Sequence, residues 1–306
     1  MPTRLWDDPH AFAAAVRTVP VRAVGVPRGV FLIAPAEFHL ATESARDNAY
    51  MQMEQPVDPQ RASAQHQGLA RALARAGIPT HCFPGHPDTP DAVFPNNVFA
   101  TAPGRLIIGA MRHPVRQREA ERADIRAWFR NLLHYREIDL SAQAIVAELT
   151  GSLVIDRARG VGYCGLSERC DRAGAAAMAH AFGLDHVLVF ELAKGEYHTN
   201  VVMSALAGRG LLLCPEGFAD ARVAEALASI DRNATVLIDS AEKLGYAGNC
   251  IALGEHGLWM STSAERALRP STCNAIESLG LAIHSVELDE LEKAGGSLRC
   301  MIGEIY

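Results

Sequence analysis

One pattern of elements recurs along residues 78–288, and it restricts the fold more than any other feature of this 306-residue chain. Each copy has a β-rich strand, a loop, a strand-turn-strand hairpin and an Ala/Leu-rich helix. In the first copy we predict the strand at 78–83, the hairpin at 98–110 and the helix at 119–133. Three further copies keep this order, at 135–140, 152–166 and 172–182, at 186–192, 201–214 and 221–230, and at 235–239, 250–261 and 271–279. A repeat of roughly 50 residues is typical of radially repeated folds.

The fifth copy is incomplete at the C-terminal end of the chain. Residues 281–288 supply its strand and residues 301–306 its last apolar run, but no second hairpin strand or helix follows. The N-terminal part of the chain holds the missing elements, a buried strand at 29–35 and a helix at 60–76 that ends at Gly77. We therefore predict an α/β ring of five units, closed by pairing of the N- and C-terminal segments, as a single domain over residues 1–306.

Polar residues gather in the loop before each predicted hairpin. They are Asp91, Asn96 and Asn97 in the first copy, Glu148 in the second, His198 and Asn200 in the third, Asn249 in the fourth and Cys300 in the fifth. Equivalent positions in a closed ring point to a common axis. A carboxylate, a histidine and a thiol should then meet in one central pocket, as covalent catalysis requires.

Cys300 is the predicted nucleophile. It follows the glycine pair Gly295-Gly296, which lets the backbone pass close to a ligand, and we expect it where the last strand begins. The alternative is a buried core thiol, the usual state of a free cysteine. Cys250 also lies beside a loop of the site, but the strand that it starts is typical of core.

Six short stretches carry a resemblance to the guanidine-group-modifying superfamily of arginine deiminases, dimethylarginine dimethylaminohydrolases and amidinotransferases. They are residues 89–97, 148–156, 165–169, 197–201, 248–249 and 295–301, in family order over nearly the whole chain. The chain most resembles the citrulline-hydrolase-like, arginine-deiminase-related branch. The resemblance implies a five-bladed α/β-propeller, called a pentein. It also implies Cys300 as nucleophile, His198 as general acid and base, Glu148 as the carboxylate that holds the substrate's terminal nitrogens, and Arg169 as a partner of the amino acid's carboxylate.

Two departures from the family pattern bear on the substrate. Deiminases that act on a cationic guanidinium have aspartates where this chain has Asn97 and Asn200. An unpaired buried guanidinium costs several kcal/mol, whereas amides both donate to and accept from a neutral ureido group. Leu149 also replaces an expected glycine.

We therefore predict a hydrolase acting on carbon–nitrogen bonds other than peptide bonds, which converts citrulline to ornithine, ammonia and carbon dioxide through a covalent Cys300 intermediate. Arginine deiminase, arginine dihydrolase and dimethylarginine dimethylaminohydrolase activities are the alternatives. The expected substrate-binding residues are Asn97, Asn96, Asp91, Arg169, Asn200 and Asn249.

Composition limits the remaining function classes. The net charge of −6 without a basic block argues against a nucleic-acid partner, so we expect a small amino-acid substrate. No run approaches the ~20 apolar residues of a membrane span, so we expect a cytoplasmic protein. Seven scattered cysteines without ligand spacing predict neither a metal nor any other cofactor. The sequence allows a homodimer. Two other function classes remain as alternatives, a papain-type acyl hydrolase and a non-catalytic small-molecule-binding propeller.

Overall fold

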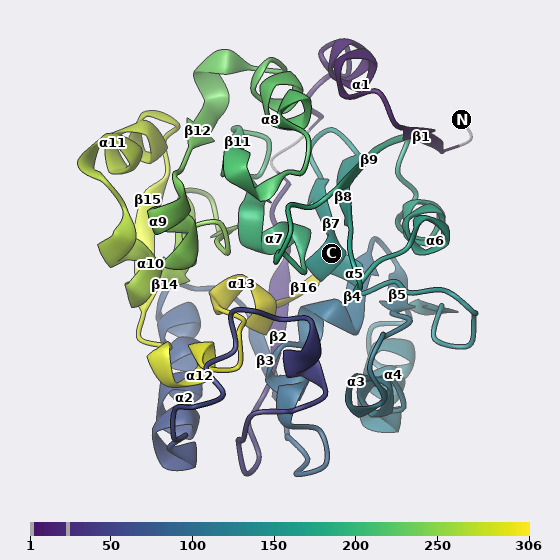
Figure 1. Cartoon of the computed structure of the whole chain (residues 1–306). Helices are drawn as coiled ribbons and strands as arrows, with labels where there is room; N and C mark the ends of the chain where they lie inside the picture. Colours follow the sequence, from purple (N-terminus) through teal and green to yellow (C-terminus); the bar gives the residue numbers. More distant parts are fainter. Residues whose placement is uncertain (1–2, 23–24) are drawn as a thin grey trace.

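Five separate β-sheets organise the computed structural model, which describes residues 3–22 and 25–306 (Figure 1). Four sheets have three strands, and the other has four. In spatial order they are β16 (Gly303–Ile305), β2 (Gly29–Ile33) and β3 (Thr80–Phe83); β4 (Phe99–Ala102), β5 (Arg105–Ile108) and β6 (Arg136–Asp139); β7 (Leu153–Asp156), β8 (Val161–Leu166), β9 (His186–Glu191) and β1 (Arg4–Trp6); β10 (Met203–Ala205), β11 (Leu211–Leu213) and β12 (Thr235–Leu237); and β13 (Ile251–Leu253), β14 (Gly257–Ser261) and β15 (Ala282–Val286).

All five sheets share the same connectivity: two adjacent strands pair antiparallel, and a third strand then pairs parallel with the second. In one of them β4 pairs antiparallel with β5, and β5 pairs parallel with β6. Parallel neighbours need a long crossover, and a helix supplies it in each sheet. The lone strand of each predicted copy therefore pairs with the hairpin of the preceding copy. The repeat was found correctly, but its structural unit begins at the hairpin.

The crossover helices lie at the periphery of the molecule (Figure 1). They are α2 (Pro59–Arg75), α3 (Pro114–Ala120) with α4 (Ala123–Asn131), α6 (Arg172–Phe182), α8 (Ala221–Ala228), and α10 (Thr262–Ala267) with α11 (Pro270–Ser278). Helix α6 shows how local sequence sets the ends of such a helix. The side chain of Asp171 accepts a hydrogen bond from the backbone N–H of Gly174 at its start, and Gly183 takes a left-handed φ of 69° at its end. Its buried face packs Met178 and Phe182 into a cluster with Leu153 and Val187.

The C-terminal strand β16 shares a sheet with β2 from the N-terminal part of the chain, so the predicted pairing of N- and C-terminal segments is confirmed. Strand β16 pairs antiparallel with β2, with Gly303 opposite Phe31 and Ile305 opposite Gly29. The Phe31 ring occupies the space that a side chain at position 303 would need, so glycine is required there. A segment near residue 300 is thereby fixed to a strand near residue 30.

Two predicted features need correction. The helix expected at 119–133 is divided into α3 and α4, because the backbone of Arg122 turns out of the helical region and its guanidinium binds Asp124 and the carbonyl of Pro84. The N-terminal elements β1 and α1 (Pro9–Val16) were not predicted. Asp8 caps α1 and Pro9 opens it, so a helix-start signal was present in the sequence.

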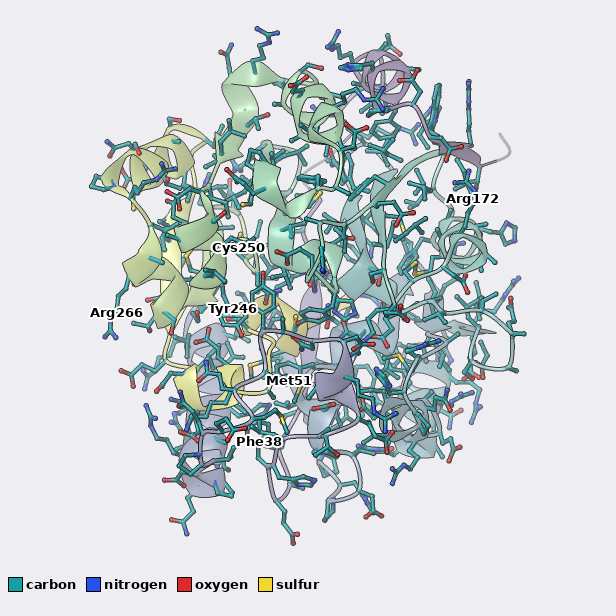
Figure 2. All side chains as sticks on the ribbon, in the orientation of Figure 1. Phe38, Met51, Arg172, Tyr246, Cys250 and Arg266 are labelled. Carbon is teal, nitrogen blue, oxygen red and sulfur yellow. The ribbon has the colours of Figure 1, made fainter. Side chains whose placement is uncertain are left out.

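The remaining helices are short. They are α5 (Leu149–Ser152), α7 (Thr199–Val202), α9 (Ser240–Leu244), α12 (Asp289–Glu292) and α13 (Leu298–Met301), with the 3-10 turns η1 (Ser44–Arg46), η2 (Pro90–Val93), η3 (Pro95–Asn97), η4 (Pro215–Gly217) and η5 (Arg232–Ala234). Figure 2 shows Arg172 and Arg266 at the periphery, with Tyr246 and Cys250 nearer the centre. Within residues 3–22 and 25–306, no helix has the length and apolarity that a membrane crossing requires.

Candidate active site

Short helical turns precede the hairpins and bring their polar residues to the centre. Turn η3 contacts both α5 and α13, and α5 also contacts α7. Glu148 lies immediately before α5, and His198 immediately before α7. Positions far apart in the chain therefore meet because each occupies the same place in its repeat, as the sequence indicated.

Cys300 lies within α13 and not at the start of a strand, which corrects the sequence prediction. The positive φ of Gly295, 78°, turns the chain, and the N–H of Cys300 then bonds to the carbonyl of Ser297, so one helical turn forms before β16 begins at Gly303. The sulfur receives a hydrogen bond from Nδ2 of Asn249 at 3.2 Å and a longer one from Nδ2 of Asn200 at 3.6 Å. Burial raises the pKa of the Cys300 thiol, and the Asn249 amide opposes this rise.

Glu148 joins His198 to Arg169. Its Oε2 lies 2.9 Å from Nε2 of His198 and 3.1 Å from Nη1 of Arg169, and all three side chains are buried. Burial alone would raise the pKa of Glu148, but the Arg169 guanidinium and the His198 hydrogen bond outweigh it and hold this pKa well below its usual range. Burial lowers the pKa of His198, although Glu148 opposes the shift. The pair therefore holds a neutral imidazole beside an ionised carboxylate.

Several buried polar atoms at the centre have no hydrogen-bond partner within the described residues. They are Nδ1 of His198, Oδ1 of Asn97, Oδ1 of Asp91, and both side-chain polar atoms of Asn96. Buried polar groups are rarely left unsatisfied, so a group of them indicates a place where a ligand or water binds. Gly151 lies beside this group: a Cβ there would lie 2.8 Å from Nδ1 of His198 and would also collide with Asn97.

A small cavity, here called the Cys300 cavity, adjoins these atoms. Five of the nine predicted site residues line it: Cys300, His198, Asn97, Asp91 and Arg169. The other four lie around it. Glu148 is bonded behind His198, Asn200 and Asn249 hold the sulfur, and Asn96 is buried without lining the cavity.

Arg116 is a lining residue that sequence reasoning missed. Its buried guanidinium donates to the carbonyl of Phe94 at 2.9 Å and to Oε2 of Glu119 at 3.0 Å. Burial and the nearby Asp91 raise the pKa of Glu119 to about 8, and Arg116 opposes this shift. An arginine followed three residues later by a glutamate is the common pattern of a surface ion pair on a helix, so the sequence carried no signal for the cavity.

Residues 41–52, here called the covering segment, were also missed. Figure 2 shows Met51 on this part of the chain, near the centre of the view. Asp47 binds Nε of Arg169 at 2.8 Å and Nε2 of His113 at 2.9 Å, and the Ser44 hydroxyl bonds to Asp91. Ser44 and Asn48 line the Cys300 cavity, so this segment completes its wall.

A family model for N,N dimethylarginine dimethylhydrolase, eukaryotic, matches residues 34–306. The chain belongs to this family. It is 24% identical over 302 residues to the N(G),N(G)-dimethylarginine dimethylaminohydrolase of Mycobacterium tuberculosis, covering 98% of this chain and 94% of that one. The family supports the expected class, a hydrolase of carbon–nitrogen bonds in guanidino compounds. The superfamily suggested by the sequence motifs is confirmed.

Solved structures show the same α/β fold. The N-terminal domain of ArgZ, an arginine dihydrolase from the ornithine-ammonia cycle in cyanobacteria, aligns with a TM-score of 0.77 at 18% identity, covering 90% of this chain and 97% of that one. A dimethylarginine dimethylaminohydrolase bound to 4-chloro-2-hydroxymethylpyridine aligns with a TM-score of 0.70 at 21% identity, covering 91% of this chain and all of the other. Among the described residues, no group of three or more His, Cys, Asp or Glu side chains is arranged to hold a metal ion.

Proposed function

We propose that this protein hydrolyses the ureido group of citrulline, giving ornithine, ammonia and carbon dioxide through a covalent intermediate on Cys300. The supporting observation is the Cys300 cavity, which joins a thiol and a neutral histidine to the Asn97 amide where a cation-specific site would carry a carboxylate. An ArgZ N-terminal domain has been solved with a covalently bound reaction intermediate, which supports covalent chemistry in this fold.

The reaction begins with ionisation of the thiol. Burial keeps the pKa of Cys300 high, so the proton must leave as substrate binds, and the neutral His198 can accept it. The thiolate attacks the ureido carbon and forms an S–C bond, and the tetrahedral adduct then expels ammonia with the proton returned by His198. The product of this step is an S-thiocarbamate in which the ornithine nitrogen stays attached.

Hydrolysis completes the turnover. His198 removes a proton from water, the hydroxide attacks the thiocarbamate carbon, and the S–C bond breaks to restore the Cys300 sulfur. The N-carboxyornithine that leaves decomposes to ornithine and carbon dioxide, so one water is consumed overall. In this scheme Glu148 orients the His198 ring through its 2.9 Å contact, and Asn249 and Asn200 position the sulfur.

We assign the carboxylate of the amino acid to the two guanidinium groups that line the cavity, Arg116 and Arg169. Arginine presents paired N–H donors that match a carboxylate. Asp47 and Glu148 already bind Arg169, so the substrate must share or displace the Asp47 contact.

One observation favours the second candidate, hydrolysis of arginine or a methylated arginine. Oδ1 of Asp91 is buried in the cavity wall without a hydrogen-bond partner among the described residues, and a carboxylate oxygen there suits a guanidinium N–H. The family match and the ArgZ likeness also agree with this candidate.

A substrate panel separates the two. Purified protein is incubated with citrulline, arginine and dimethylarginine, and ornithine, citrulline, ammonia and dimethylamine are quantified. The proposal requires ornithine and ammonia from citrulline at a kcat/KM at least comparable to that for arginine. Citrulline accumulating as a product from arginine or dimethylarginine would instead identify a deiminase or a dimethylaminohydrolase. An absence of turnover, together with an inert thiol, would support a non-catalytic binding protein.

We also propose that the five sheets form a closed five-bladed propeller and one domain. Support comes from the uniform strand order of the sheets and from the β16–β2 pairing, which joins the C-terminal strand to the N-terminal part of the chain.

A further inference from the structure

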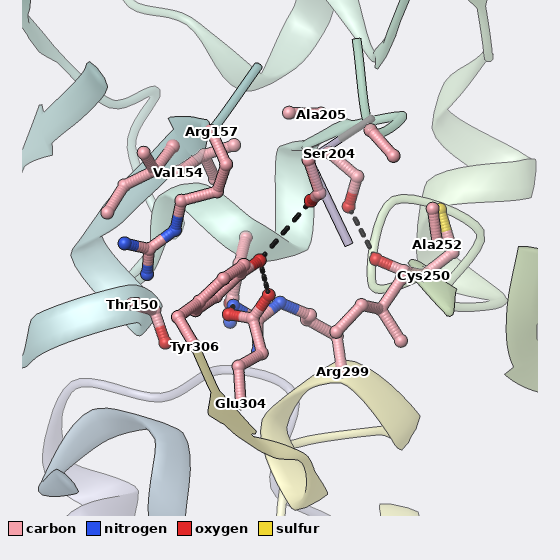
Figure 3. A pocket seen from close by; sticks show the side chains of 15 residues that line it. Thr150, Val154, Arg157, Ser204, Ala205, Cys250, Ala252, Arg299, Glu304 and Tyr306 are labelled. Carbon is pink, nitrogen blue, oxygen red and sulfur yellow. Dashed lines mark hydrogen bonds and ion pairs between the residues drawn. The ribbon is translucent and has the colours of Figure 1, made fainter. Parts of the chain in front are cut away.

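Figure 3 shows a second cavity from close by, here called the Tyr306 cavity. It is narrow and is bordered by strand residues from four sheets, among them Val154, Ser204, Ala252 and Glu304, and by Tyr306. Asn200 lines this cavity and also donates to the sulfur of Cys300, so it separates the Tyr306 cavity from the Cys300 cavity. None of the reaction steps above uses the Tyr306 cavity.

In its wall, Arg299 forms an ion pair with Glu304. Nη2 of Arg299 lies 2.7 Å from Oε2 of Glu304, and the Tyr306 hydroxyl donates to Oε1 of Glu304 at 2.8 Å. Both oxygens of the Glu304 carboxylate therefore already accept a hydrogen bond, as Figure 3 shows.

The guanidinium of Arg157 has no such partner. It lies over the Tyr306 ring, 4.3 Å from the ring centroid, and donates to the backbone carbonyl of Thr101 at 3.1 Å. In the part of the chain that the structure describes, no carboxylate forms an ion pair with it. Two arginines and one glutamate leave the cavity wall with one net positive charge. A half-buried cation that faces a polar cavity attracts an anion, and the guanidinium fork matches the oxygens of an oxyanion.

We propose that the Tyr306 cavity binds a small oxyanion of the size of inorganic phosphate, with Arg157 as its main ligand and Arg299 beside it. This site is distinct from the Cys300 cavity and does not depend on which amino acid is hydrolysed there.

Occupancy of this site has a consequence for the thiol. Arg299 immediately precedes Cys300, and its positive charge favours the thiolate. An anion bound beside Arg299 offsets part of that charge, and Asn200, which lines the same cavity, contacts the sulfur. A bound oxyanion should therefore slow reactions of Cys300 without entering the cavity that holds the substrate.

Calorimetric titration with inorganic phosphate at constant ionic strength tests the site. We expect wild-type protein to bind phosphate and Arg157→Gln to bind it about 10-fold or more weakly, because a charge-assisted contact is lost. Arg157→Lys should keep most of the binding. Arg4→Gln is the matched control, since Arg4 also stacks on an aromatic ring, that of Trp6 at 3.5 Å, but lies outside the cavity. Circular dichroism checks each variant for folding.

The outcomes are decisive in either direction. Equal phosphate binding by wild type and Arg157→Gln would overturn the site. So would the absence of binding by wild type up to about 20 mM, which corresponds to a binding free energy weaker than about 2.3 kcal/mol. If Arg157→Gln does not fold, Arg157→Ala replaces it and is compared with Arg4→Ala: an equal loss of phosphate binding in both would overturn the assignment, and a loss confined to Arg157→Ala would support it. In a second measurement, phosphate should slow alkylation of Cys300 about twofold or more in wild type and not in Arg157→Gln. An unchanged rate would overturn the coupling to the thiol.

Discussion

The side-chain amide of Asn249 donates a hydrogen bond to the sulfur of Cys300 over 3.2 Å. The same amide nitrogen donates to the backbone carbonyl of Asn200 at 2.9 Å, so its orientation is fixed. A neutral donor aimed at a buried sulfur stabilises the thiolate without supplying the full charge of an ion pair. The unliganded protein therefore holds a positioned thiol that is still largely protonated.

Replacement of the nucleophile is the first prediction. Cys300→Ser should lower turnover about 1,000-fold or more while the protein still folds, because a hydroxyl of similar shape does not ionise in this setting. Cys250→Ser is the control, since Cys250 is also buried in the centre and burial raises its pKa to about 11. Steady-state assays and thermal unfolding of both variants provide the check. Loss of turnover in Cys250→Ser with near wild-type rates in Cys300→Ser would refute the assignment.

The pH dependence of the thiol is the second prediction. Burial raises the pKa of Cys300 above its ordinary value of 9.0, so the thiolate fraction at neutral pH is smaller than for a free cysteine and grows as pH rises through the raised pKa. Alkylation by iodoacetamide in the absence of substrate should therefore be slow at pH 7 and increase into the alkaline range. Asn249→Ala removes the opposing hydrogen bond and should move the profile to still higher pH. A profile that levels off below pH 8 would contradict this account.

The close approach of Gly151 to the histidine gives the third prediction. Gly151→Ala places a methyl group 2.8 Å from Nδ1 of His198, so the imidazole or Asn97 must move, and turnover should fall about 100-fold. Gly68→Ala is a matched control within α2, where an added methyl group meets no atom within 4 Å and should stabilise the helix by about 1 kcal/mol. Similar kcat values for the two variants would show that the contact with His198 has no catalytic importance.

Much of the fold could be predicted because its pattern is local. Hairpins with glycine turns and Ala-rich helices repeat along the chain, and the helix predicted at 172–182 matches α6 residue for residue. The pairing of strands across helices is not a local property. The sequence therefore showed the repeat but not which hairpin each lone strand joins, which is set by the crossover helix.

The site residues also differ in whether the sequence could predict them. Asn97, His198 and Cys300 were found because they occupy equivalent positions in successive repeats, and the structure brings them to one cavity. Arg116 and Asp47 lie outside those positions, on α3 and on the covering segment, and reach the cavity only through tertiary packing. No periodicity marks such residues.

Substrate charge gives the last prediction, and it depends on Asn97. Oδ1 of this amide is buried in the cavity wall without a partner among the described residues, so a ureido N–H can occupy it without a counter-charge. Asn97→Asp adds a carboxylate at the same position, which favours a guanidinium by about 1.5–3 kcal/mol, or roughly 10- to 150-fold in affinity. The ratio of kcat/KM for citrulline to that for arginine should therefore fall in Asn97→Asp, while Asn131→Asp, a change at the end of the peripheral helix α4, should leave it unchanged. Both ratios can be measured from initial rates of ammonia release, because attack on either substrate liberates ammonia. A wild-type protein that strongly prefers arginine, with a ratio that Asn97→Asp does not alter, would reject citrulline as the substrate and favour the guanidino compounds.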